Sequence, residues 1–255
     1  MELYLLGTGT CAPNPRRTPA CYFLSAGPRS FIIDPGPGAV NRIIAAGLDP
    51  FGAEAVFISH HHLDHCADLP YYLFCKAVCP TGRDPRGLTI VAPPGFNKVY
   101  QGMLAIWGKW LVSDRYRVVI EEVGDAAWES GAMRFTAKSM LHGANGVGFR
   151  FERKGGPSLA YSGDTAYCEE LVELAGGADT FLCECAWPNE HEVDGHMRPA
   201  DVAQAALRAG VPRVILTHFY PLVNTSTVAA DVRAAGYKGE IIVGEDGMKV
   251  SLGRI

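Results

Sequence analysis

The chain has 255 residues, of which 48% are hydrophobic and 20% charged, and its formal net charge is -4. These values are typical of a globular protein and exclude a disordered or collagen-like chain, and no apolar run approaches the roughly 18–20 residues of a membrane span. The slight excess of acidic residues argues against a broad nucleic-acid-binding face.

Short apolar runs, bounded by glycine and proline, predict strands and helices along the whole chain. The predicted strands span residues 3–6, 21–24, 31–33, 55–59, 89–91, 118–122, 133–137, 148–152, 159–162, 180–183, 214–217 and 241–243. The predicted helices span residues 40–46, 67–78, 96–111, 169–174, 200–209 and 226–235. Early strands follow one another as in hairpins and later strands alternate with helices. We therefore expect an α/β fold of two packed sheets with helices outside.

The strongest motif is HHHLDH at residues 60–65, in which His60, His62, Asp64 and His65 form the pattern H-x-H-x-D-H. Imidazole nitrogens and carboxylate oxygens are suitable donors for zinc, and also for iron or manganese. Four donors in six residues suit a loop that leaves a strand and can turn toward two neighbouring ions. A solvated histidine-rich run or an expression tag fits less well, because a tag would lie at a terminus and lack the aspartate.

Four apolar runs each lead into a residue of a type that binds metal ions. These residues are His60, His142, Asp164 and His218. Because strand ends can converge on one edge of a sheet, the four side chains can meet in space. Taken singly, His142 and His218 would more often be structural histidines, and Asp164 fits an ordinary Asx turn equally well. The metal motif shifts this balance toward ligands, and a carboxylate can bridge two cations where a neutral imidazole cannot.

Two other patterns lead to no site. Residues 7–12 (GTGTCA) match the glycine pattern of a dinucleotide-binding turn, but that fingerprint needs a helix at the glycines, and Pro13, Pro15 and Pro19 oppose one. The eight cysteines form no C-x-x-C pair in a chain too long for a typical disulfide scaffold, so we expect reduced thiols. The first residues lack the long apolar stretch of a signal peptide, which favours a cytoplasmic protein.

These pieces together resemble the metallo-β-lactamase-fold superfamily and, within it, the ribonuclease Z-like branch. The matching segments, in the family's order, are residues 6–10 (LGTGT), 31–36 (FIIDPG), 58–65 (ISHHHLDH), His142 before 146–150 (GVGFR), 161–165 (YSGDT), 195–197 (GHM) and 216–219 (LTHF). The motif with the later His, Asp and His is specific for the superfamily, and Gly195-His196 before a helix is more specific for the branch. The resemblance implies a four-layer αββα sandwich that spans residues 1–255 as a single domain.

By position, the resemblance implies a site for two divalent metal ions. The first ion would take His60, His62 and His142, the second Asp64, His65 and His218, and Asp164 would bridge them. Zinc suits this histidine-rich set best, while manganese and iron accept the same donors. Outside the ligand set, His196 is implied as a proton donor to the leaving group or as a contact to a phosphate oxygen. Glu184 is the candidate that orients it, unless it is a salt-bridged acid at a strand end.

The expected activity is hydrolysis of a phosphodiester by a hydroxide held between the metal ions, with Asp64, His196 and Glu184 as catalytic residues. The substrate would be a small phosphodiester, such as a cyclic nucleotide, or the 3′ end of a tRNA. The tRNA-processing members carry a long arm between the third histidine and the bridging aspartate. Only 21 residues separate His142 from Asp164 here, so no arm is expected. Together with the acidic composition, this favours small phosphodiesters.

Other functions remain open at this stage. Thioester, lactone or β-lactam cleavage could use the same metals and would not need His196. Redox chemistry at iron, as in the flavodiiron relatives, is disfavoured because those resemble H-x-E-x-D-H whereas this chain has His62 at the middle position. A non-catalytic metal-binding regulator is disfavoured because degenerate members usually lose ligands. The family often forms dimers, so a homodimer is compatible with the resemblance, and no membrane partner is expected.

Overall fold

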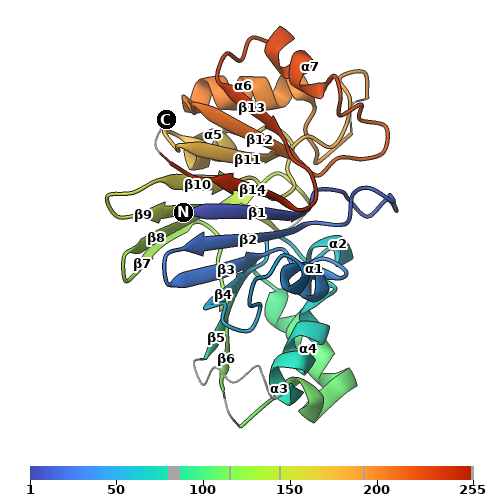
Figure 1. The fold of residues 1–255 in the computed structure, drawn as a ribbon, viewed down its shortest axis with the longest axis vertical. Coiled ribbons are helices and arrows are strands. Elements are labelled where there is room, and N and C mark those ends of the chain that lie inside the picture. The colour runs from blue at the N-terminus through green and yellow to red at the C-terminus, as the bar shows by residue number, and fades with distance from the viewer. Residues whose placement is uncertain (80–86, 115, 144, 192, 254–255) are drawn as a thin grey trace.

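The computed structural model describes residues 1–79, 87–114, 116–143, 145–191 and 193–253, which form the strands and helices of Figure 1. The strands are β1 (Glu2–Gly7), β2 (Cys21–Ala26), β3 (Arg29–Ile33), β4 (Ala55–Phe57), β5 (Leu88–Ala92), β6 (Val118–Glu122), β7 (Ala126–Ser130), β8 (Met133–Met140), β9 (Gly146–Arg153), β10 (Ser158–Tyr161), β11 (Thr180–Glu184), β12 (Arg213–Thr217), β13 (Glu240–Val243) and β14 (Met248–Ser251). The helices are α1 (Ala39–Ala45), α2 (Leu63–Cys66), α3 (Leu69–Val78), α4 (Phe96–Trp107), the 3-10 helix η1 (Gly108–Leu111), α5 (Glu169–Ala175), α6 (Pro199–Ala209) and α7 (Val228–Ala234).

The described strands form two mixed sheets that pack face to face (Figure 1). The first sheet has the order β14-β1-β2-β3-β4-β5-β6, and the second has the order β13-β12-β11-β10-β9-β8-β7. One apolar cluster lies between the sheets. A second joins the first sheet to α1, α3 and α4, and a third joins the second sheet to α5, α6 and α7. Three cores between four layers are the αββα sandwich expected from the sequence.

The burial of each strand follows from its place in its sheet. The central strand β10 of the second sheet is buried at every residue, as is its parallel neighbour β11, and both contain a buried apolar run. The prediction missed only strands at the sheet edges, β7 and β14. The apolar run of β7 is only three residues long before two polar residues, and the apolar residues of β14 are separated by a lysine.

The helix predicted at 67–78 is α3, which begins two residues later, at Leu69, and the short helix α2 before it was not predicted. One predicted helix is divided in the structure. The run at 96–111 becomes α4 and η1, which meet at Gly108 with a φ of 52°. Glycine adopts this left-handed backbone without a Cβ clash, so it ends the α-helix there.

The strand directions bring several loops to one edge. β3 and β4 are parallel in the first sheet, and β10, β11 and β12 are parallel in the second. β8 runs in the same direction as β10, because both are antiparallel to β9. The carboxyl ends of parallel strands lie at the same edge of a sheet, so the loops that follow these strands are neighbours.

Two further observations bear on the sequence analysis. All eight cysteines are free thiols, as expected, and they range from buried to exposed. In the part of the chain that the structure describes, no helix combines the length and the apolar character needed to cross a membrane.

The inter-sheet core makes a stability prediction at Phe151, which is fully buried on β9. Its ring lies 4.8 Å from that of Phe57 and 6.3 Å from that of Phe31, both on the opposite sheet. We expect Phe151→Ala to lower the free energy of unfolding by about 3–5 kcal/mol, because the truncation leaves a cavity between the sheets. Urea unfolding in the presence of a chelator measures this without a contribution from metal binding.

The matched control is Ile106→Ala, at a side chain that is 72% exposed. It should change the free energy of unfolding by no more than about 0.5 kcal/mol. Equal effects of the two substitutions would contradict the assignment of Phe151 to the core.

Candidate metal centre

The loop after β4 carries the H-x-H-x-D-H motif into α2. His62 is the N-cap of this helix and has extended backbone, whereas Asp64 and His65 lie inside it. The chain therefore turns between His60 and Asp64, so the four donors are not confined to one helix face. The predicted loop after a strand is present for the first two donors, but the last two are helical.

Two trios of donor side chains form at this edge of the sandwich. The ligand atoms of His60, His62 and His142 all lie within 4.8 Å of one another, and so do those of Asp64, His65 and His218. Within the first trio, His142 Nε2 lies 3.3 Å from His62 Nδ1. Within the second, His65 Nε2 lies 3.2 Å from His218 Nε2. These two trios match the sets that the resemblance implies, and three further groups among the described residues include Asp164 or His196.

The carboxylate of Asp164 lies between the two trios. Its Oδ2 atom is 3.7 Å from His60 Nε2 and 3.4 Å from His218 Nε2, and its Oδ1 atom is 3.4 Å from His65 Nε2. The side chain therefore faces members of both sets at once. This is the position that a bridging ligand requires.

The donor set fits divalent cations. Among the described residues, His60 Nε2 and Asp164 Oδ1 are buried atoms without a hydrogen-bond partner. A buried polar atom left unpaired costs about 1–3 kcal/mol, so a group that engages both atoms would stabilise this arrangement. Imidazole and carboxylate donors that face one another in a buried place suit a zinc-type ion.

The pKa directions at the trios follow from burial and from the neighbouring charges. Burial holds the pKa of His60 well below its usual range, so this imidazole is neutral, the form that binds a metal ion. Burial opposes ionisation of Asp64 and Asp164, but the neighbouring His218 and His65 outweigh it and hold the pKa of both carboxyls below the usual range. For His65, burial is outweighed by Asp164 and Asp34, which raise its pKa.

Asp34 supports His65 from behind, a role that the sequence analysis did not predict. Its Oδ2 atom accepts hydrogen bonds from His65 Nδ1 at 2.8 Å, from the Ser59 hydroxyl at 2.6 Å and from the Tyr161 hydroxyl at 2.6 Å. Its Oδ1 atom accepts the Ser59 backbone N–H at 2.7 Å. The sequence contained one signal for this role, a carboxylate directly after the strand β3. Such a partner fixes the tautomer and orientation of a metal-binding imidazole.

Two of these residues have unusual backbone. Asp34 has a φ of 48° and His218 a φ of 58°, and they are the two non-glycine residues with positive φ in the described chain. Left-handed backbone costs an L-residue about 1–2 kcal/mol. Both residues hold donor groups at the same site, where such strain concentrates.

His196 and Glu184 form a pair beside the trios. His196 Nδ1 lies 3.0 Å from Glu184 Oε1. The same carboxylate accepts the backbone N–H of Thr165 at 2.8 Å and that of Met197 at 3.1 Å. Burial acts to lower the pKa of His196, but the hydrogen bond and charge of Glu184 outweigh it and raise the pKa. Glu184 thus accepts three donors, one of which is His196.

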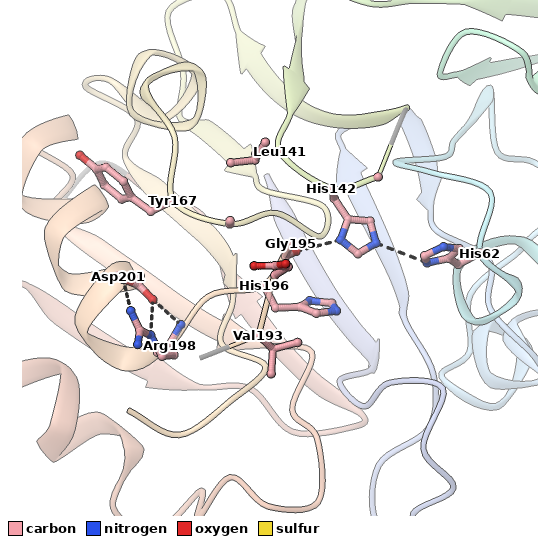
Figure 2. Close-up of a pocket in the computed structure, with 12 residues that line it drawn as sticks. His62, Leu141, His142, Tyr167, Val193, Gly195, His196, Arg198 and Asp201 are labelled. Atoms are coloured by element: carbon pink, nitrogen blue, oxygen red, sulfur yellow. Dashed lines mark hydrogen bonds and ion pairs between the residues drawn. The ribbon is translucent and has the colours of Figure 1, made fainter. Parts of the chain in front are cut away.

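Gly195 brings His196 and His142 together. Its carbonyl accepts a hydrogen bond from His142 Nδ1 at 2.8 Å, which leaves Nε2 of that ring for the first trio. Gly195 has a φ of 78°, and a Cβ atom built on it would lie 3.0 Å from His142 Nδ1. Glycine is required at this position for both reasons. Figure 2 shows His142 between His62 and the segment that carries His196.

A cavity of about 560 Å³ opens beside the first trio (Figure 2). Its lining residues are His62, Leu141, His142, Gly143, Ala166, Tyr167, Val193, Asp194, Gly195, His196, Arg198 and Asp201. At its far end Arg198 Nε donates to Asp201 Oδ2 at 2.9 Å, which also caps α6. The cavity is therefore lined by side chains of the first trio, by His196 and by other polar and apolar residues.

The comparison with known proteins agrees with this geometry. Residues 29–219 match the family described as "Beta-lactamase superfamily domain". The chain belongs to this superfamily. The protein named Ribonuclease Z of Mycobacterium sp. (strain KMS) is 32% identical over 275 residues, which covers 96% of this chain and 94% of the relative.

Solved structures share the fold. The metallo-β-lactamase fold protein YhfI from Bacillus subtilis superposes with a TM-score of 0.83 at 20% identity and covers 98% of both chains. The short form of human tRNase Z superposes with a TM-score of 0.81 at 21% identity and covers 99% of both chains. The fold and the ribonuclease Z-like membership inferred from the sequence are thereby confirmed, as is a metal-dependent hydrolase. The roles of the individual site residues stay predictions.

The support of His65 by Asp34 can be tested by metal affinity. We expect Asp34→Asn to weaken metal binding about 10–100-fold, because the loss of a carboxylate behind a metal-binding histidine has effects of this size. Competition with a chelator, followed by elemental analysis, measures the affinity.

Asp179→Asn is the matched control. Asp179 also accepts a backbone N–H and a hydroxyl, both from Ser158, but it contacts no residue of the trios among its described hydrogen bonds. Equal metal affinity of the Asp34 variant and the unmodified protein would contradict the role given to Asp34.

Proposed function

We propose that the chain is a phosphodiesterase that uses two divalent metal ions, with zinc as the favoured metal, to cleave P–O bonds in small phosphodiesters such as cyclic nucleotides. The observation that carries the proposal is the pair of His196 and Glu184, in which His196 lines the cavity next to the first trio and Glu184 is buried behind it. A departing alkoxide gains from a positioned proton donor, whereas acyl hydrolysis on the same metals does not need His196.

The two trios and Asp164 provide a ligand set for this proposal. His60, His62 and His142 would hold one ion, Asp64, His65 and His218 the other, and Asp164 would bridge them. When bound, two such ions activate water at neutral pH and stabilise the entering and leaving oxygens of an in-line displacement.

The remaining steps belong to side chains of the chain itself. Asp64, whose side chain is 12% exposed, can accept the proton of the attacking water. Glu184 holds Nδ1 of His196, which leaves the Nε2 nitrogen to give a proton to the departing oxygen. The raised pKa of His196 favours the protonated form that this role requires. The Gly195 carbonyl keeps His142 oriented beside it.

Three features support a small substrate. The cavity of about 560 Å³ is of the size that encloses a small molecule. The segment between His142 and Asp164, where the tRNA-processing members insert an arm, is used for β9 and β10. The net charge of -4 provides little general attraction for a polynucleotide.

A tRNA 3′ endonuclease is the second candidate. Its support is the similarity to a Ribonuclease Z along nearly the whole chain. An RNA 3′ end can reach the same site, and the metals and His196 would act on it in the same way. Dimer formation and a cytoplasmic location remain predictions under either candidate.

The role of His196 predicts a dependence on the leaving group. The unmodified protein with about two metal ions per chain should hydrolyse bis(p-nitrophenyl) phosphate, and chelation or Asp64→Ala should abolish the activity. His196→Ala should lower kcat for diphenyl phosphate by about 10²–10⁴-fold, the usual contribution of a general acid. The loss should be much smaller with bis(p-nitrophenyl) phosphate, because p-nitrophenolate leaves without protonation.

His191→Ala is the matched control, since His191 is exposed and lies on the same segment as His196. It should leave both rates unchanged. Equal losses with the two substrates in His196→Ala would contradict proton donation. Two bound metals with activity only on thioesters, lactones or β-lactams would replace the proposal with acyl hydrolysis, and full metal occupancy with no turnover of any ester would favour a regulatory protein.

The substrate class can be tested by direct comparison. We expect kcat/KM for at least one cyclic nucleotide to exceed that for a tRNA precursor with a 3′ extension. The cleavage of any RNA should also depend only weakly on salt, because few basic contacts would be lost. A higher kcat/KM for the tRNA precursor, with a steep loss between about 50 and 200 mM salt, would favour the second candidate.

A further inference from the structure

Two aromatic side chains join the loops that carry His196 and His218. Trp187 lies in the loop between β11 and His196, and Tyr220 lies two residues beyond His218. Their rings stack with centroids 4.5 Å apart and 20° between the planes. A close stack of this kind contributes about 0.5–1.5 kcal/mol beyond the burial of its area. It therefore links two segments that are distant in the sequence.

The backbone makes the same connection. The Tyr220 N–H donates to the carbonyl of Ala186 at 3.2 Å, and the Trp187 N–H donates to the carbonyl of Met197 at 3.3 Å. Met197 follows His196 directly and gives its own N–H to Glu184. The Trp187 segment is thus hydrogen-bonded to Tyr220 on one side and to Met197, next to His196, on the other.

Tyr220 packs against both histidines, whose own rings stack with centroids 5.8 Å apart. Its ring centroid lies 5.9 Å from that of His196 and 6.2 Å from that of His218, and both ring pairs are close to perpendicular. Its hydroxyl lies 3.4 Å from the Cys11 thiol, which connects it to the loop after β1. The ring position of Tyr220 is therefore fixed from two sides, by Trp187 on its face and by Cys11 at its tip.

The indole of Trp187 is held for its ring and not for its N–H group. Its Nε1 atom is buried without a hydrogen-bond partner among the described residues. An unpaired buried donor costs about 1–3 kcal/mol, so a side chain selected for hydrogen bonding would not be placed here. A phenylalanine at this position would keep much of the stack and remove the unpaired donor.

We infer that Trp187 and Tyr220 are positioning residues that set the imidazole of His196 against the metal-ligand trios, an inference that rests on the proposed function of His196. Glu184 holds Nδ1 of His196 and the backbone N–H of Met197, but it does not connect this segment to the loop that holds His218. The stack supplies that connection and so constrains the His196 loop. A displacement of about 1 Å at a reacting group can cost up to 10²-fold in rate, so the constraint acts on the rate.

The kinetic test uses Trp187→Ala and its conservative counterpart Trp187→Phe. We expect Trp187→Ala to lower kcat for diphenyl phosphate about tenfold, with a smaller change in KM and unchanged metal content, and to have much less effect on bis(p-nitrophenyl) phosphate. Trp187→Phe should restore most of the lost kcat. In a His196→Ala background, Trp187→Ala should have no further effect, because residues that act through one another are not additive. Trp110→Ala, at an indole that is 54% exposed, is the matched control and should behave like the unmodified protein.

A second measurement does not depend on activity. In protein labelled with ¹⁵N-histidine, the ring resonances of His196, assigned by their loss in His196→Ala, should shift in Trp187→Ala and return toward their original positions in Trp187→Phe. Unchanged resonances, or additive losses in the double variant, would overturn the inference. If the unmodified protein hydrolyses no phosphodiester, the proposed function fails, while the resonances still decide whether Trp187 positions His196.

Discussion

The imidazoles and carboxylates of the site have to be held close together in a largely buried place. This requirement constrains the conformation of the loops at one edge of the sandwich. Three of the imidazoles have their other ring nitrogen held by a neighbouring group. Asp34 holds His65, the Gly195 carbonyl holds His142, and the Ser59 hydroxyl lies 3.1 Å from Nδ1 of His60. A hydrogen bond on one ring nitrogen sets which nitrogen remains for a ligand. The supporting groups are therefore as much a part of the site as the donors.

The site has a closed side and an open side. His65 and His218 are buried, whereas His62 is exposed and borders the cavity together with His142 and His196. A substrate can therefore approach from the side of the first trio, where His196 also lies, while the second trio remains shielded by protein. This arrangement keeps the deeper charges in a low dielectric, where they act more strongly on one another.

The sequence was sufficient for the donors and insufficient for their supports. His60, His142, Asp164 and His218 could be predicted because each follows an apolar strand, and the direction of parallel strands then brings them to one edge. The edge strands β7 and β14 escaped prediction because their apolar runs are short or interrupted by a polar residue. Asp34 carried a weak signal in its position after β3. The stack of Trp187 on Tyr220 carried none, because it depends on tertiary contact between two loops and on no local pattern.

The donors come from both halves of the sandwich. The loop after β4 provides His60, His62, Asp64 and His65, whereas His142, Asp164 and His218 follow strands of the second sheet. Neither half contains a complete set, so an ion bound here also acts as a cross-link between the two sheets. By mass action, a ligand at 100 times its Kd that binds only the folded state adds about 2.7 kcal/mol to folding stability. The ion concentration around the protein therefore determines the fraction of the enzyme that carries metal and is ready for catalysis. It also determines how strongly metal binding stabilises the packing of the two sheets.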